Sequence, residues 1–101
     1  MSEISYAALV QRDFRLCLLK TLAEQPSYTG SETILQAIAK SYGHARSRES
    51  VRTELNFLAS VSAVTLKEQG GYSIASITRR GLDHVEGLVE IDGVNRPSPK
   101  E

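Results

Sequence analysis

The first long stretch of the chain, about residues 5–24, has apolar residues at the spacing of an amphipathic helix. Every fourth position is apolar: Val10, Phe14, Leu18 and Leu22. That period places these side chains on one side of a helix. Because Pro26 disfavours helical geometry in the residue before it, the helix is expected to end just before this proline.

A second helix is expected from about Ser31 to Gly43. Its first turn has two candidate N-caps: Thr29, which has capping-box spacing to Glu32, and Ser31 itself. Gly43 suits the left-handed conformation that ends many helices. The apolar stripe of this helix consists of Ile34, Leu35, Ile38, Ala39 and Tyr42.

A third helix follows after a short link and is expected over residues 48–60, with Ser47 as its N-cap. Val51, Leu55 and Leu58 form its buried face. The side chains expected on its other faces are Arg48, Glu49, Arg52, Thr53 and Asn56. Two helices joined by a short turn, the second with an exposed polar face, are typical of a helix-turn-helix.

The period of apolar residues then changes from that of a helix to the period of two that marks a strand. Two alternating segments, residues 64–68 and 72–77, lie on either side of Gly70-Gly71, a pair that readily forms a hairpin turn. A last helix is expected from its cap Thr78 to about residue 88, with an inner face of Leu82, Val85 and Leu88.

These elements predict a mainly α protein with a small β-hairpin wing, that is, a winged helix-turn-helix. One domain is expected over residues 1–90, and its length fits a single modest core. Residues 91–101 contain two prolines and few large apolar residues, so they are expected to form a flexible C-terminal tail.

Composition narrows the class of protein. The chain has 12 Lys and Arg against 12 Asp and Glu, so its formal net charge is zero, which disfavours nonspecific coating of nucleic acid. It has one cysteine, so an intrachain disulfide is excluded and a reducing compartment is expected. Neither a signal peptide nor a membrane-spanning run is recognisable. We therefore expect a cytoplasmic protein with no membrane partner.

The charges are nevertheless distributed unevenly. Residues 40–52 contain four cations and one acid, whereas every formally charged residue in 83–92 is an acid. A positive face of this kind suits docking on duplex DNA, with the third helix in the major groove. Arg48 and Arg52 could pair with guanine, and Asn56 with adenine. The full set of candidate DNA-binding residues is Arg46, Ser47, Arg48, Ser50, Arg52, Thr53, Asn56, Lys67, Arg79 and Arg80.

The alternative for the third helix is that its polar residues are only the solvated side of an amphipathic helix. Arg79 and Arg80 have the same two interpretations, phosphate contact or simple exposure. Cys17 lies in an apolar stripe and is expected to pack in the core. His44 and His84 are far apart and have no second ligand at metal spacing. No metal, cofactor or enzymatic activity is expected.

Three segments resemble a family of small proteins of Mu-like bacteriophages and prophages that are described as winged-helix or arsenic-repressor-like. They are residues 43–55, 77–83 and 93–99, and the last, Gly-Val-Asn-Arg-Pro-Ser-Pro, is the most distinctive. The resemblance implies a phage-encoded winged helix in the bacterial cytoplasm. The chain departs from the family at Ser62, where glycine is usual, and it lacks the cysteine pair of metal-sensing arsenic repressors.

Two functions follow as hypotheses. In the first, the protein is a transcription regulator that binds duplex DNA as a homodimer formed through its first helix, its last helix or both. In the second, the winged helix is a protein-protein interaction module that binds a phage or host protein without binding DNA. The segment Arg96-Pro97-Ser98-Pro99 favours the second hypothesis, because extended proline segments suit partner grooves.

Overall fold

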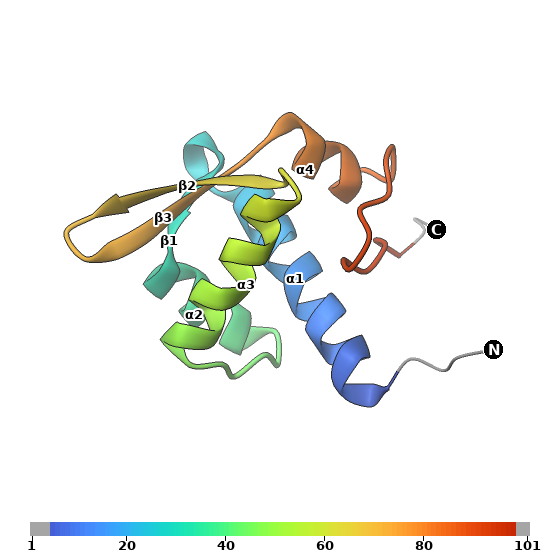
Figure 1. Ribbon diagram of the computed structural model, residues 1–101, viewed down its shortest axis with the longest axis horizontal. Helices are drawn as coiled ribbons and strands as arrows, with labels where there is room; N and C mark the ends of the chain where they lie inside the picture. The colour runs from blue at the N-terminus through green and yellow to red at the C-terminus, as the bar shows by residue number, and fades with distance from the viewer. Residues whose placement is uncertain (1–4, 99–101) are drawn as a thin grey trace.

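The computed structural model describes residues 5–98, which form four α-helices and a three-stranded antiparallel sheet (Figure 1). The elements, in chain order, are α1 Tyr6–Glu24, the 3-10 turn η1 Pro26–Tyr28, β1 Thr29–Ser31, α2 Glu32–Ser41, α3 Arg48–Ser60, β2 Val64–Gln69, β3 Tyr72–Ile77 and α4 Arg79–Val85. The protein is thus a small α+β fold. Pro99, part of the predicted tail, lies outside the described residues.

Each helix begins at a side chain that caps its first turn. Ser5, Ser31, Ser47 and Thr78 accept a hydrogen bond from the backbone N–H three residues further on, as an N-cap does. Ser31 is therefore the cap of α2. The other candidate, Thr29, lies in β1 and its hydroxyl is 2.8 Å from that of Ser76 on β3.

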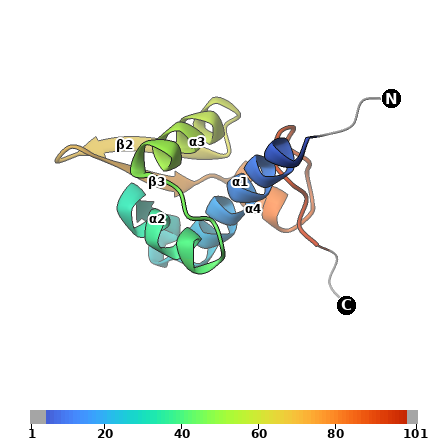
Figure 2. The ribbon, with the colours of Figure 1, turned by 90° about the horizontal axis from the view of Figure 1, so that it is seen from below.

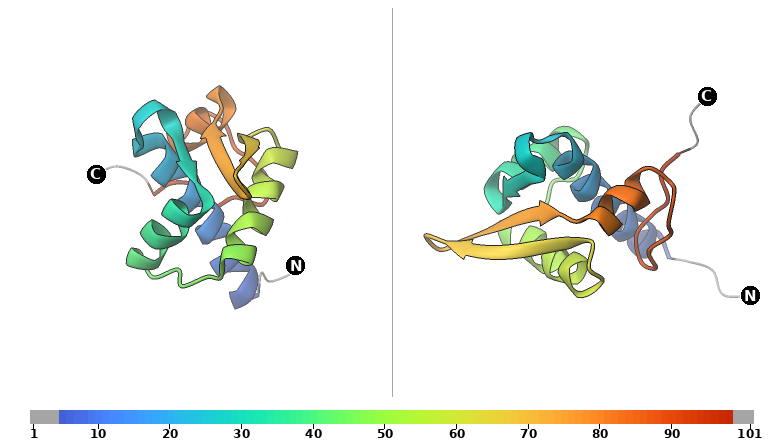
Figure 3. Two further views of the ribbon diagram at one scale, coloured as in Figure 1. Left: turned by 90° about the vertical axis from the view of Figure 1, so that its left-hand side faces the viewer. Right: turned by 90° about the horizontal axis from the view of Figure 1, so that it is seen from above.

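The sheet has the strand order β1-β3-β2, and its three strands run side by side in the left view of Figure 3. β2 and β3 form the predicted hairpin, closed by Gly70 and Gly71 with φ of 59° and 83°. β1 was not expected from the sequence. It is three residues long, too short to show a period of two, and it pairs with β3 over Thr29–Ser31.

The core lies between α1, the inner faces of α2 and α3, and the sheet. Its largest apolar members are Phe14, Leu18, Leu19, Leu22, Leu35, Leu55, Leu58 and Ile91. The predicted stripe of α2 is wrong in part, because Ile34 is 50% exposed and Tyr42 is 66% exposed. The fully buried positions of α2 are instead Glu32, Leu35 and Ala39, so the helix is turned relative to the expected face.

The end of the chain differs from its prediction. α4 ends at Val85 and not near residue 88, since Gly87 takes a φ of 81° and Leu88 is exposed. The tail expected from residue 91 begins too early, because Ile91 and Val94 are buried in the core. These two apolar residues, three positions apart, belong to the buried core and hold the segment in place.

Ser62, between α3 and β2, has a φ of 63°. This is the left-handed conformation that a glycine would take without cost and that costs another residue about 1 kcal/mol. The turn is held by the hydroxyl of Thr78, which donates to the carbonyl oxygens of Ser62 at 2.7 Å and Ala63 at 3.0 Å. Ser62 therefore takes the left-handed conformation although it is not a glycine.

Candidate nucleic-acid interface

The outer face of α3 is an exposed polar surface next to the hairpin. Its exposed positions are Glu49, Thr53, Asn56 and Ser60, which follow one another at intervals of four, three and four residues. In Figure 2, the hairpin extends beyond α2 and α3 at one end of the molecule, while α1 and α4 lie at the other. We call α3 together with the hairpin the α3–wing surface.

Arg48 and Arg52, the two central candidates on α3, both bind one buried carboxylate, that of Glu32 at the start of α2. Arg52 donates to Glu32 through Nε at 3.1 Å and Nη2 at 2.6 Å, a bidentate pair. Arg48 Nε lies 3.2 Å from the same carboxylate. The Glu32 side chain is 0% exposed, whereas those of Arg48 and Arg52 are 42% and 39% exposed. The buried carboxylate of Glu32 thus fixes the orientation of the two exposed guanidinium groups.

The same carboxylate also fixes the hairpin. Glu32 accepts a hydrogen bond of 2.6 Å from the backbone N–H of Ser73, and both arginines donate to the carbonyl oxygen of Gly71 at the turn. Arg48 stacks on the ring of Tyr72, with Cζ 4.3 Å from the ring centre. The hydrogen bonds to Arg52 are the main reason that the pKa of Glu32 is lowered to about 2. We call this cluster the Glu32 site.

A second buried carboxylate, Glu54, lies on the other side of α3. It accepts a hydrogen bond of 2.7 Å from Arg15 of α1 and one of 3.0 Å from Gln11. Arg46, in the loop before α3, approaches it to 3.7 Å. Arg15 stacks on the Phe57 ring, with Cζ 3.6 Å from the ring centre. This cluster, the Glu54 site, joins α1 to α3 and to the loop before α3.

The remaining predicted residues have varied places. Ser47 caps α3, and the Ser50 hydroxyl accepts a hydrogen bond from Arg46 Nε at 2.8 Å, so both serines have structural roles. Thr53 and Asn56 are exposed on the outer face of α3, and Lys67 is exposed on β2. The structure brings Thr53, Asn56 and Lys67 to the α3–wing surface.

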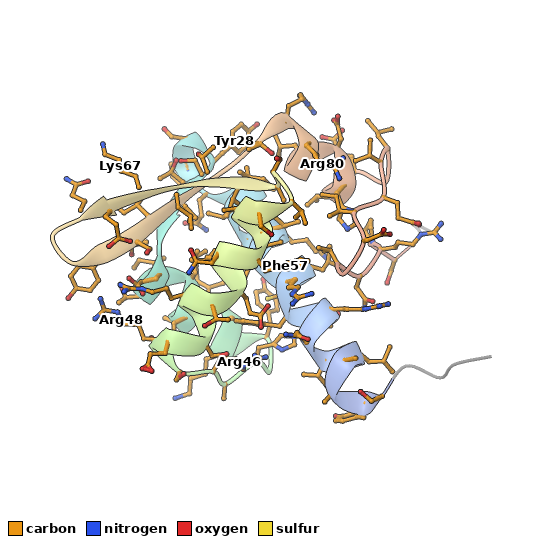
Figure 4. The ribbon with its side chains drawn as sticks, viewed as in Figure 1. Tyr28, Arg46, Arg48, Phe57, Lys67 and Arg80 are labelled. Atoms are coloured by element: carbon orange, nitrogen blue, oxygen red, sulfur yellow. The ribbon has the colours of Figure 1, made fainter. Side chains whose placement is uncertain are left out.

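Arg79 and Arg80 are not at this surface. They begin α4, at the far end of the hairpin from its tip, and Figure 4 shows Arg80 well apart from Arg48 and Lys67. Arg79 pairs with Asp83 at 3.0 Å, and Arg80 donates to the carbonyl oxygen of Val61 at 3.0 Å. A duplex lying on α3 and the hairpin tip would therefore need to extend well past α3 to reach them.

The roles of Glu32 and Glu54 were not predicted from the sequence, although a signal was present. Glu54 lies three residues after Val51 and four before Leu58, which places it on the buried face of α3. Glu32 has the same relation to Leu35 and Ala39 of α2. An acid on an apolar stripe must find cations when it is buried, and the nearby arginines are the available partners.

The histidines and the cysteine take part in local structure. The Nδ1 of buried His84 accepts from the Ile91 N–H at 3.1 Å, so its Nε2 donates to the Asn95 carbonyl at 2.8 Å. His44 Nε2 lies 2.9 Å from Asp13. Cys17 is half-buried against the core, and burial raises the pKa of its thiol. Within residues 5–98 no three potential metal ligands come together.

Among these same residues, no helix has both the length and the apolar character needed to cross a bilayer.

Fold and surface together define a small α+β protein in which a polar helix and a hairpin are tied together through a buried carboxylate. The chain is 35% identical over 92 residues to the uncharacterized protein gp26 of Escherichia phage Mu, covering 91% of this chain and 95% of gp26. It is 38% identical over 80 residues to an uncharacterized protein of Haemophilus influenzae, covering 78% of each. The chain belongs to this family of Mu-like phage proteins. No family model and no solved structure matches it.

Proposed function

We propose that the protein is a winged helix-turn-helix that binds duplex DNA through the outer face of α3 and regulates transcription of a phage or prophage in the host cytoplasm. The order of elements supports this class: α2 and α3 form the helix pair, and β2 and β3 form the wing. The observation that carries the proposal is the exposed polar face of the 13-residue α3 beside a projecting hairpin. A helix presented in this way fits a major groove.

The structure changes the roles expected of the α3 residues. Thr53 and Asn56 are the exposed side chains that would read base edges, and Asn56 would pair with adenine. Arg48 and Arg52 would contact phosphates with their Nη1 groups, because Nε and Nη2 of both are already engaged at the Glu32 site. Lys67 on the hairpin would contact the neighbouring backbone.

The experiment is selection of bound duplexes from fragmented phage DNA, followed by a salt titration on the preferred duplex. Asn56→Ala should weaken binding to that duplex by about 1–3 kcal/mol and relax its sequence preference. Lys67→Ala should weaken all duplexes alike. Arg79→Ala, which removes an exposed cation on α4 away from this surface, is the control and should leave binding unchanged. The absence of binding to any fragment at low salt would reject the proposal.

One observation favours a second candidate, a protein-protein interaction module that does not bind DNA. Arg46 is paired with Glu54, and Arg48 and Arg52 are paired with Glu32. The charge of Glu49 also acts on Arg52. These acids offset most of the positive charge that phosphate binding relies on. In that case α3 would bind a phage or host protein. Thr53→Arg should then abolish binding of that protein, whereas removal of residues 96–101 tests the proline-containing tail separately.

A further inference from the structure

A stripe of side chains on the outer side of α1 takes no part in the α3–wing surface, and of its members only Cys17 packs against the core. Its members lie three or four residues apart, as positions on one face of a helix do: Tyr6, Leu9, Asp13, Cys17, Lys20 and Glu24. At a rise of about 1.5 Å per residue, the stripe is about 27 Å long. The N-terminal half of α1, which carries Tyr6 and Leu9, projects from the body of the protein (Figure 1).

Two hollows lie along this stripe. One, of about 310 Å³, extends from Asp13 to Glu24, and the other, of about 440 Å³, extends from Tyr6 to Asp13. They share Asp13, Tyr42 and His44 and thus form one groove beside the helix. Tyr6 is 82% exposed and Leu9 is 45% exposed, so the groove has an apolar end and a charged end.

The order of charges along the stripe determines what can bind in the groove. Asp13 is followed seven residues later by Lys20, and both are exposed. The Asp13 side chain is 54% exposed although one of its oxygens contacts His44, so the carboxylate can accept a second partner. Two parallel copies of α1 would place like charges together, whereas two antiparallel copies would pair each Asp13 with Lys20 of the other copy.

This register has a two-fold axis between Leu16 and Cys17. The axis makes the contact self-complementary, as a two-fold dimer requires. Leu9 falls opposite Glu24 of the second copy. The exposed Tyr6 adds apolar area at one end of the groove, and the exposed Tyr42 adds apolar area where the two hollows meet. A contact of this length is at the small end of stable interfaces, so the affinity is expected to be modest.

We propose that the outer stripe of α1 binds a second copy of the chain in this antiparallel register. The surface lies apart from α3 and the hairpin, so the proposal stands whether or not the protein binds DNA. If it does bind DNA, the dimer presents two copies of α3 related by a two-fold axis.

Sedimentation equilibrium from about 5 to 500 µM tests the proposal. The wild-type chain should form dimers, and Lys20→Asp should weaken them at least tenfold because it places two acids together. The double variant Asp13→Lys with Lys20→Asp should restore the dimer by reversing both pairs. Lys40→Asp, an exposed change on α2 away from the stripe, is the charge-matched control and should leave the affinity unchanged.

Leu9 supplies an independent test that leaves the Asp13–His44 contact intact. Since Leu9 faces Glu24 of the second copy, Leu9→Lys should tighten the dimer and Leu9→Glu should weaken it, a difference of at least tenfold between the two variants. A wild-type monomer at every concentration would overturn the proposal. So would a double swap that fails to restore dimers while its circular dichroism remains native, or two Leu9 variants of equal affinity.

Discussion

The Glu32 site and the Glu54 site are built from the same chemistry and differ in what covers them. In each, a buried carboxylate binds two arginines. At the Glu54 site, the side chains of Arg15 and Arg46 are 13% and 26% exposed and stack on Phe57 and Phe14. At the Glu32 site, the two arginines are about 40% exposed. The first site is closed and joins α1 to α3, whereas the second is open and lies at the α3–wing surface.

The comparison shows that an arginine on a helix surface can serve the fold and the surface at once. A guanidinium group has five N–H donors, and a buried carboxylate uses only some of them. Where the remainder is buried, the arginine is structural. Where the remainder faces solvent, it can also contact a partner in an orientation that the protein has already fixed.

The largest difference between the sites should appear when the carboxylate of the closed site is neutralised. Glu54→Gln should lower the free energy of unfolding by about 3–5 kcal/mol, because it leaves Arg15 charged and nearly buried without its anion. Urea denaturation at pH 7 measures this effect. Glu32→Gln is the matched variant and should lower the free energy of unfolding by less, since its arginines can be hydrated. Equal losses would mean that the exposure of the arginines does not distinguish the two sites.

Acid should weaken the open site in a predictable range of pH. The pKa of Glu32 is lowered from 4.5 to about 2 in the folded protein, so its stabilisation is complete above pH 4.5 and is lost as the pH falls toward 2. At about 1.4 kcal/mol per pKa unit, the contribution is at most about 3–4 kcal/mol. Unfolding free energies of the wild type and of Glu32→Gln should therefore differ at pH 6 and converge by pH 2. A difference in unfolding free energy that does not change with pH would contradict the lowered pKa of Glu32.

Conservative replacement of one arginine at each site should give a smaller effect. Arg15→Lys should cost about 1–2 kcal/mol, because lysine cannot contact Glu54, Gly93 and the Phe57 ring together. Arg52→Lys should cost less than about 1 kcal/mol, since Arg48 remains on the same carboxylate. Thermal melting of both variants measures the difference, and the reverse order would mean that exposure does not govern these contacts.

The smallest effect is expected for an arginine that belongs to neither site. Arg79 is 70% exposed and pairs with Asp83 and Glu86 on the surface of α4. Arg79→Ala should change the unfolding free energy by less than about 0.5 kcal/mol, as is usual for exposed ion pairs. The same denaturation series provides the measurement. A loss as large as that of Arg15→Lys would show that exposure is a poor guide here.

The long elements could be predicted from the sequence because their signals are local. The period of α1, the cap and stripe of α3, and the Gly70-Gly71 turn each fall within one short window of residues. β1 could not be found in this way, since it is a strand only through its pairing with β3, more than 40 residues away. The burial of Ile91 and Val94 likewise depends on distant elements.

The candidate surface was predicted less well than the fold. The segment containing α3 was identified, but its charge was judged from the residues of that segment alone. Glu32 lies on another helix and reaches Arg48 and Arg52 only once α2 and α3 pack together. A count of charges along the chain therefore overestimated the positive charge at the α3–wing surface.

The contact between Arg15 and the backbone of Gly93 joins residues 78 positions apart, and close by the Asn95 N–H donates to the carbonyl oxygen of Arg12. A ribosome must therefore release almost the whole polypeptide before α1 can acquire all of its neighbours. Contacts of such long range form slowly because a large loop must first close. During synthesis, these two contacts between α1 and residues 93–95 cannot form, and a polypeptide interrupted before residue 93 would lack both.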